Sequence, residues 1–322
     1  MKNYDLIIIG AGPVGLYAAF YAGMRGLSVA LIEAFDEVGG QPQNLYPEKT
    51  IYDIAGLPAI SGADLAKNLL TQLNRIEYES FTGERVENIL KTVEGFEIKS
   101  DKAIRSAKSV LLTTGAGLIT PRKIGVERED EFYESGKLSY FIKSLEDFRN
   151  QKVAVLGGGD SALDWALMLE DVASEVHLIH RRTAFRAHEI TVELVTNSSV
   201  EIHVPYVVSG LTDRGIELNL VKSDEKLALD VDKILVNYGF LTSQLDVIEN
   251  LEVNRVGRIL VDREMRTNIE GIYAAGDGAD YQGKVPLLAV GFGEAVTAVN
   301  TITKDIVFEH SLRKGHSSTL FS

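Results

Sequence analysis

The stretch YDLIIIGAGPVG, residues 4–15, decides the fold of this chain. Its apolar run Tyr4–Ile9 is typical of a strand that is buried on both faces. A Gly-x-Gly-x-x-Gly turn follows, and a helix over 16–25 and a second strand over 28–32 complete a βαβ unit of about thirty residues. This arrangement is the fingerprint of a dinucleotide-binding fold.

Each glycine of this turn has a physical role. Gly10 permits the tight turn, Gly12 lets the backbone approach a pyrophosphate, and Gly15 lets the helix pack closely on the strand. Pro13 lies in the same turn and is an expected cofactor contact, and the positive end of the helix that follows attracts phosphate. Glu33, at the end of the second strand, is placed to accept hydrogen bonds from ribose hydroxyls, so this unit predicts FAD or NAD.

The same pattern returns as KVAVLGGGDSA, residues 152–162. A strand over 152–156 precedes the turn residues Gly157, Gly159, Asp160 and Ser161, and a helix over 163–172 and a strand over 175–179 follow. This second strand ends without a carboxylate, at His180, Arg181 and Arg182, with Arg186 close behind. Arginines there bind a 2′-phosphate through charge-assisted hydrogen bonds, so the second unit predicts NADP.

The rest of the chain predicts an α/β protein with two Rossmann-like domains. Further helices are expected over 62–74 and 288–304, and further strands over 85–89, 95–100, 109–112, 200–204, 217–221, 233–236 and 272–275. The chain is expected to cross between domains at 118–123 and to return at 238–240. We therefore expect a discontinuous first domain, 1–118 plus 242–322, and a second domain, 119–241.

Composition excludes several classes of function. The 322 residues carry a formal net charge of −13, which disfavours nucleic-acid or anionic-membrane binding. There is no cysteine, which excludes disulfides, thiolate metal sites and dithiol redox chemistry. No charge-free apolar run of membrane-spanning length is found, and we expect a cytoplasmic protein without a metal site.

One further string, Gly271-Ile272-Tyr273-Ala274-Ala275-Gly276-Asp277, resembles the flavoprotein disulfide reductases with two dinucleotide domains, and among them the low-molecular-weight thioredoxin reductases. Those enzymes need a Cys-x-x-Cys pair, which residues 137–143 lack. The chain is instead similar to the thioredoxin-reductase-like ferredoxin–NADP⁺ reductases. The matching strings are GGQ at 39–41 with YPEK at 46–49, GGGDSALDWA at 157–166, HRR at 180–182 with FRAHE at 185–189, and HSSTLF at 316–321.

This resemblance implies domains of the three-layer ββα type, with FAD in the first domain and NADPH in the second. It implies that Tyr46 stacks on one face of the flavin, that His316 in the C-terminal tail covers the other, and that Ser318 lies near flavin N5. The remaining FAD contacts that it implies are Gly40, Gln41, Val86, Ile119, Gly276 and Asp277. In this family the tail can cover the flavin of a second subunit, which implies a homodimer.

The implied function is electron transfer between NADPH, as a two-electron hydride donor, and ferredoxin or flavodoxin, as one-electron carriers, with the tail or the domain angle as a gate. Two alternatives stay open: an NADPH-dependent quinone reductase, diaphorase or oxidase without a protein partner, and a redox-sensing FAD/NADP module. Docking of an acidic carrier would need local cations. The candidates are Lys49, Arg122, Lys123, Lys284, Arg313 and Lys314.

Overall fold

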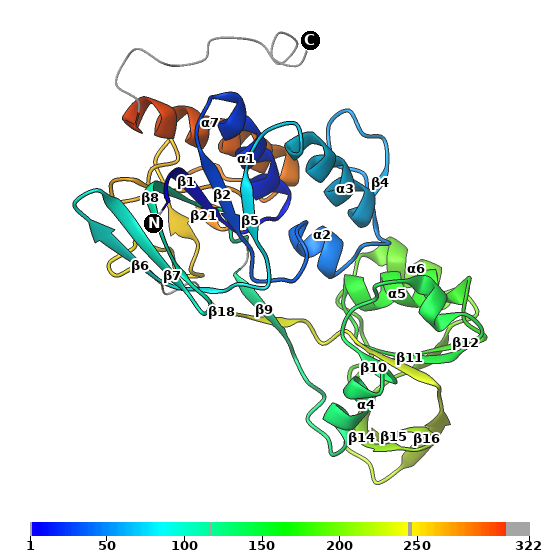
Figure 1. The fold of residues 1–322 in the computed structure, drawn as a ribbon. Helices are drawn as coiled ribbons and strands as arrows, with labels where there is room; N and C mark the ends of the chain where they lie inside the picture. The colour runs from blue at the N-terminus through cyan, green and yellow to red at the C-terminus, as the bar shows by residue number, and fades with distance from the viewer. Residues whose placement is uncertain (1, 116, 244–246, 307–322) are drawn as a thin grey trace. The chain divides into compact units, whose positions relative to one another are not determined.

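The computed structural model describes residues 2–115, 117–243 and 247–306, and it divides into two compact units (Figure 1). Unit 1 comprises 1–118 and 242–322, and unit 2 comprises 119–241. The chain passes between them where β9 (Leu118–Pro121) pairs with β18 (Phe240–Ser243). Among the described residues, no helix is long and apolar enough to cross a membrane.

Unit 1 is built on a seven-stranded sheet in the order β5-β2-β1-β8-β7-β6, with β20 also pairing with β8. The strands β5, β2, β1, β8 and β20 run parallel, whereas β8, β7 and β6 form an antiparallel meander. The strands are β1 (Asn3–Ile9), β2 (Val29–Ile32), β5 (Glu79–Phe81), β6 (Val86–Thr92), β7 (Gly95–Ser100), β8 (Ile104–Leu112) and β20 (Ile272–Ala274).

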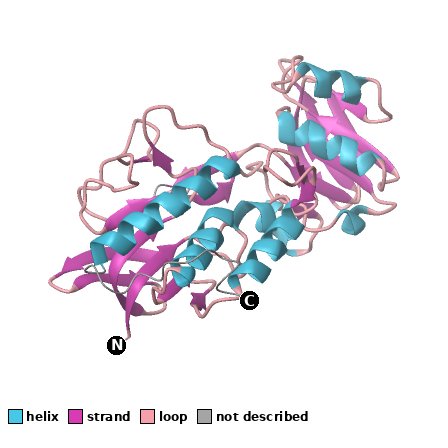
Figure 2. Ribbon diagram, turned by 90° about the horizontal axis from the view of Figure 1, so that it is seen from above, coloured by secondary structure: helices cyan, strands magenta, loops and turns pink. Residues whose placement is uncertain are grey.

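Alternating side chains of β1 face two separate apolar cores. Leu6 and Ile8 pack on the helices, whereas Ile7 and Ile9 pack on the side of β6 and β7. The unit therefore has three layers, with helices covering one face of the parallel strands (Figure 2). Its helices are α1 (Pro13–Met24), α2 (Gly40–Asn44), α3 (Gly62–Leu73) and α7 (Leu288–Ile306), and its short strands are β3 (Thr50–Ile51), β4 (Ile60–Ser61), β19 (Ile259–Leu260) and β21 (Ala279–Asp280).

Unit 2 repeats this three-layer plan with a five-stranded parallel sheet in the order β10-β17-β11-β12-β13. One face packs on the antiparallel sheet β14-β15-β16, and α5 packs on β11 and β12. Its elements are α4 (Glu129–Glu134), β10 (Leu138–Ser139), the 3₁₀ helix η1 (Leu145–Phe148), β11 (Lys152–Leu156), α5 (Asp160–Glu170), β12 (Glu175–Ile179), α6 (Glu189–Thr196), β13 (Glu201–His203), β14 (Tyr206–Thr212), β15 (Gly215–Leu220), β16 (Lys226–Asp230) and β17 (Lys233–Val236).

The structure confirms an α/β fold and moves some boundaries. Helix α1 begins at Pro13 and α5 at Asp160, each three residues before the expected start. The helices begin inside the glycine turns because the backbone after Gly12 and Gly159 is already helical, with both glycines as extended N-caps. Strand β8 ends at Leu112 as expected but begins at Ile104, five residues before the expected start.

We expect Gly15→Ala to lower the free energy of unfolding by about 1–3 kcal/mol, because overpacking strains a close contact. A Cβ at Gly15 would lie 1.9 Å from the carbonyl oxygen of Gly10, and a backbone atom cannot swing away. The matched control is Gly293→Ala on α7, where a Cβ meets nothing within 4 Å and should raise stability by up to about 1 kcal/mol. Urea unfolding followed by circular dichroism measures both, and equal stabilities would contradict this account.

Candidate functional site

The first glycine turn joins β1 to α1 at the carboxyl edge of the parallel sheet. Gly10 has a φ of 102°, and its N–H donates to the carbonyl of Ile32 at 2.8 Å. The hydroxyl of Thr113 donates to the Gly10 carbonyl at 2.7 Å, which ties the turn to the end of β8. A Cβ at Gly12 would meet nothing nearer than Gly40 Cα at 3.7 Å, so a ligand can approach this backbone.

Glu33 supports the turn from the end of β2. Its side chain is buried, and its carboxylate accepts the N–H groups of Ala11 at 2.7 Å and Phe35 at 3.0 Å. Burial raises the pKa of Glu33, and the backbone hydrogen bonds from Phe35, Ala11 and Ala34 oppose that rise. The predicted ribose acceptor therefore already fixes the glycine turn through one oxygen.

A second loop packs on the first. Gly39 N–H donates to the Ala11 carbonyl at 2.8 Å, and a Cβ at Gly40 would lie 2.6 Å from Gly12 Cα. This contact places α2 and its Gln41 beside the turn, and Gln41 Nε2 lies 3.8 Å from where a Cβ at Gly115 would sit.

Tyr46 follows α2 and is half-buried. Burial, together with the negative charges of Asp277 and Asp53, raises the pKa of Tyr46 to about 12. The structure thus brings Tyr46 and Asp277 into one electrostatic environment, although they are far apart in the sequence. At neutral pH the phenol is protonated and its hydroxyl is a hydrogen-bond donor.

Gly276, which precedes Asp277, is held by a buried network that the sequence analysis missed. Glu294 of α7 accepts the Gly276 N–H at 2.8 Å and the Tyr281 hydroxyl at 2.8 Å. Lys284 forms an ion pair with Glu294 and donates to the Gly276 carbonyl at 3.0 Å. Only 2% of the Lys284 side chain and 4% of the Glu294 side chain are exposed.

A sequence signal for this network does exist. Glu294 lies in the buried stripe of α7 with Gly291, Ala295 and Ala298, and a charge in such a stripe needs a buried partner. The prediction that Lys284 is a docking cation was therefore wrong, because its ammonium group is buried and paired with Glu294. Lys123 is exposed and pairs with Asp130, and both Arg122 and Lys123 line a groove that is described below.

Several predicted FAD contacts are less fully described. Val86 is buried in the apolar core beside β7, so its side chain serves packing. The side chain of Ile119 lies outside the described residues, as do His316, Ser318, Arg313 and Lys314. The roles of these residues stay predictions.

In unit 2 the glycine turn 157–159 lies at the mouth of an open groove of about 990 Å³. A Cβ at Gly157 would lie 2.6 Å from the Asn237 carbonyl oxygen, whereas one at Gly159 meets nothing nearer than Arg186 O at 3.8 Å. Ser161 lines the same groove. Asp160 also lines it, and its carboxylate accepts the His188 N–H at 2.9 Å at the start of α6.

The basic residues after β12 take different positions around this groove. Arg181 and Arg186 are exposed and line it, whereas Arg182 is exposed but does not. The His180 ring packs beneath Gly158, where a Cβ would approach it to 2.3 Å. Burial lowers the pKa of His180, and the charges of Arg181, Arg182 and Arg186 lower it further, so the ring is neutral at pH 7.

Two buried polar atoms at this groove have no partner among the described residues. They are Nε2 of His180 and Nδ2 of Asn237. An unpaired buried polar atom costs free energy unless a ligand or water satisfies it. The groove therefore offers two cationic arginines and the N-terminus of α5 without a side-chain cap, beside two residues with an unpaired buried nitrogen.

Comparison with known proteins relates almost the whole chain to one family of oxidoreductases. The model of the pyridine nucleotide-disulphide oxidoreductase family matches residues 4–301. A curated ferredoxin–NADP reductase of Lactococcus lactis subsp. lactis (strain IL1403) is 62% identical over 321 residues and all of both chains. One of Streptococcus pyogenes serotype M28 is 46% identical over 99% of this chain and 98% of its own.

Two solved structures share the fold. The thioredoxin reductase of Lactococcus lactis has a TM-score of 0.76 at 27% identity, over 94% of this chain and 99% of its own. That of T. acidophilum has a TM-score of 0.76 at 25% identity, over 95% and 99%.

We expect Lys284→Met to lower the free energy of unfolding by about 3–5 kcal/mol, because it leaves the Glu294 carboxylate buried without its cation. The matched control is Lys91→Met, which removes an exposed ion pair with Glu270 and should cost at most about 1 kcal/mol. Chemical denaturation of both variants measures the difference. A Lys284 variant as stable as the Lys91 variant would refute the role of the buried pair.

Proposed function

The chain belongs to the pyridine nucleotide-disulphide oxidoreductase family, and on this premise we propose that it is a cytoplasmic ferredoxin–NADP reductase. The main support for this proposal is the similarity to ferredoxin–NADP reductases over the whole chain. The absence of cysteine supports it, because dithiol exchange of the thioredoxin reductase kind needs two thiolates. The electron carrier is ferredoxin or flavodoxin.

We assign FAD to unit 1, in a domain of residues 1–118 plus 242–322. The open backbone at Gly12 and the uncapped start of α1 suit a pyrophosphate, with Pro13 in the first turn. Glu33 keeps a second carboxylate oxygen toward Phe35 and suits ribose hydroxyls at the same edge. Gly40 packs on the turn with Gln41 beside it, and we include Tyr46, Gly276 and Asp277 among the FAD contacts.

We assign NADP(H) to unit 2, in a domain of residues 119–241. Arg181 and Arg186 supply charge for the 2′-phosphate, and the start of α5 at Gly159 and Asp160 supplies N–H groups for the pyrophosphate. His180 and Asn237, each with a buried nitrogen that has no partner among the described residues, also line the groove. Ser161 adds a hydroxyl.

When bound, the flavin supplies the chemistry, since it accepts a hydride from NADPH and delivers electrons singly to the carrier. The residues of this chain bind and orient. The Lys284–Glu294 pair holds the Gly276 backbone in place, and Tyr46 stays protonated beside Asp277. No side chain is needed as a nucleophile or general base.

The tail completes the proposed site. We propose that His316 and Ser318 cover the flavin of their own or of the second subunit of a homodimer, and that their displacement gates hydride transfer. The resemblance of the HSSTLF string to the family's tail supports this assignment. Because Lys284 is buried, the cations left for an acidic carrier are Lys49, Arg122, Lys123, Arg313 and Lys314.

The test of this function is NADPH-driven cytochrome c reduction by the purified protein with and without added ferredoxin or flavodoxin. We expect the rate to rise strongly with the carrier, because cytochrome c receives its electrons through it. A rate that neither carrier changes, with direct reduction of quinone or oxygen, would instead establish a diaphorase or oxidase.

Arg181→Ala and Arg186→Ala should each raise KM for NADPH by about 10–100-fold, since a hydrogen bond to a charged group contributes about 1.5–3 kcal/mol. KM for NADH should not change, because NADH lacks the 2′-phosphate. Steady-state kinetics with both nucleotides measures this selectivity. Arg214→Ala is the matched control, because this exposed arginine pairs with Asp230 away from the groove. An equal rise in KM for both nucleotides would argue against phosphate recognition.

A further inference from the structure

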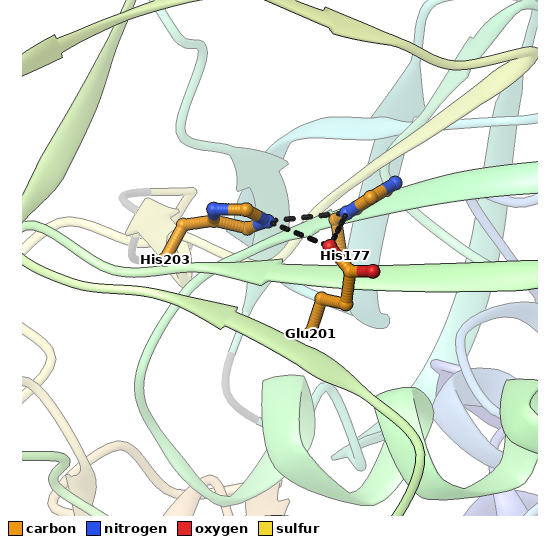
Figure 3. Close-up of side chains that lie close together, drawn as sticks. All are labelled: His177, Glu201 and His203. Carbon is orange, nitrogen blue, oxygen red and sulfur yellow. Dashed lines mark hydrogen bonds and ion pairs between the residues drawn. The ribbon is translucent and has the colours of Figure 1, made fainter. Parts of the chain in front are cut away.

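Two histidines and a glutamate of unit 2 converge outside the proposed nucleotide groove (Figure 3). His177 lies in β12, and Glu201 and His203 lie in the neighbouring edge strand β13. We propose that His177, Glu201 and His203 form a binding site for a divalent transition metal ion, with Zn²⁺ as the fitting ion. This proposal does not depend on the proposed electron-transfer function.

Strand register explains why the three side chains share one face. In the parallel pair, His177 is the partner of Glu201, and Ile179 is the partner of His203. Residues two apart on a strand point to the same face, so His203 projects on the same side as Glu201 and as its partner His177. Figure 3 shows the two rings and the carboxylate pointing toward one another.

The separations of the three ligand atoms suit one ion. His177 Nδ1 lies 3.1 Å from His203 Nε2 and 3.4 Å from Glu201 Oε2, and His203 Nε2 lies 3.8 Å from the same oxygen. A point equidistant from atoms at these separations lies about 2.0 Å from each, which agrees with ordinary Zn–N and Zn–O bond lengths of about 2.0–2.2 Å. No rearrangement of the strands is needed.

The other ring nitrogen of His177 has the partner expected for a metal ligand. Its Nε2 lies 3.2 Å from Glu175 Oε1, and Glu175 is itself held by Lys152 at 2.8 Å. The charge of this carboxylate favours a proton on Nε2, which leaves the Nδ1 lone pair for an ion held with Glu201 and His203. Metal-bound histidines almost always have such an outer carboxylate or carbonyl, so Glu175 is a positioning residue.

The surroundings leave a route to solvent. The side chain of His177 is 5% exposed and that of His203 is 15% exposed, whereas that of Glu201 is 58% exposed. An ion therefore enters from the Glu201 side and keeps a fourth position for water. Two histidines and one carboxylate with an open fourth position form a ligand set that zinc accepts, and nickel and copper also favour imidazole.

The test begins with the whole purified protein, dialysed against a chelator and then titrated with ZnCl₂ by calorimetry. We expect one tight site per chain. His203→Gln and Glu201→Gln should each weaken it by more than about 100-fold, beyond the 10–100-fold effect expected for the positioning variant Glu175→Gln. Zinc should also raise the thermal unfolding midpoint of the wild type, because an ion that binds only the folded state stabilises it.

Matched control variants distinguish the loss of a metal ligand from the loss of any exposed imidazole or carboxylate. His188→Gln removes an imidazole that is 86% exposed, and Glu270→Gln removes a carboxylate that is 94% exposed; both should bind zinc as the wild type does. Because Glu201 is largely exposed, its variant should fold, and circular dichroism checks this. Zinc binding that is absent from the wild type, or unchanged in the His203 and Glu201 variants, overturns the proposal.

Discussion

Both units depend on one steric constraint, a turn between strand and helix where no Cβ fits. A Cβ at Gly10 would lie 2.5 Å from the carbonyl oxygen of Thr113, and one at Gly157 would lie 2.6 Å from that of Asn237. Thr113 directly follows β8 and Asn237 directly follows β17, and these are the parallel neighbours of β1 and β11. The close approach of two parallel strand ends therefore places each helix start at the sheet edge, where phosphate is stabilised.

The two units support this turn differently. In unit 1 the residue after the second strand is Glu33, which holds the turn by accepting a backbone N–H. In unit 2 the corresponding His180 holds it by packing its ring beneath Gly158. The same architectural position thus serves a polar or an apolar contact, and the surrounding charge changes from acidic to basic. This difference agrees with the proposed assignment of FAD to unit 1 and NADP(H) to unit 2.

The sequence predicted features that depend on local spacing. The two glycine turns, their flanking strands and the α/β class follow from short-range patterns, because tight turns demand glycine. Contacts between distant segments were not predictable in this way. From the sequence alone Lys284 is predicted to be a surface cation, because its partner Glu294 comes from α7. His177 and His203 do not have a sequence spacing typical of metal ligands, and only the pairing of β13 with β12 brings them together. The helix starts were placed late because glycine and proline were read as breakers rather than as N-terminal residues.

The discontinuity of unit 1 has a consequence for biosynthesis. Unit 2 contains residues 119–241 and is complete once that segment has left the ribosome. Unit 1 still lacks β20, the partner of β8, and α7, which carries Glu294. Its sheet can close only after β20 is synthesised, up to Ala274, and its buried ion pair only after Glu294. The inserted unit therefore has its full set of strands first, whereas the sheet that holds the N-terminal glycine turn gains its last strand, β20, only afterwards.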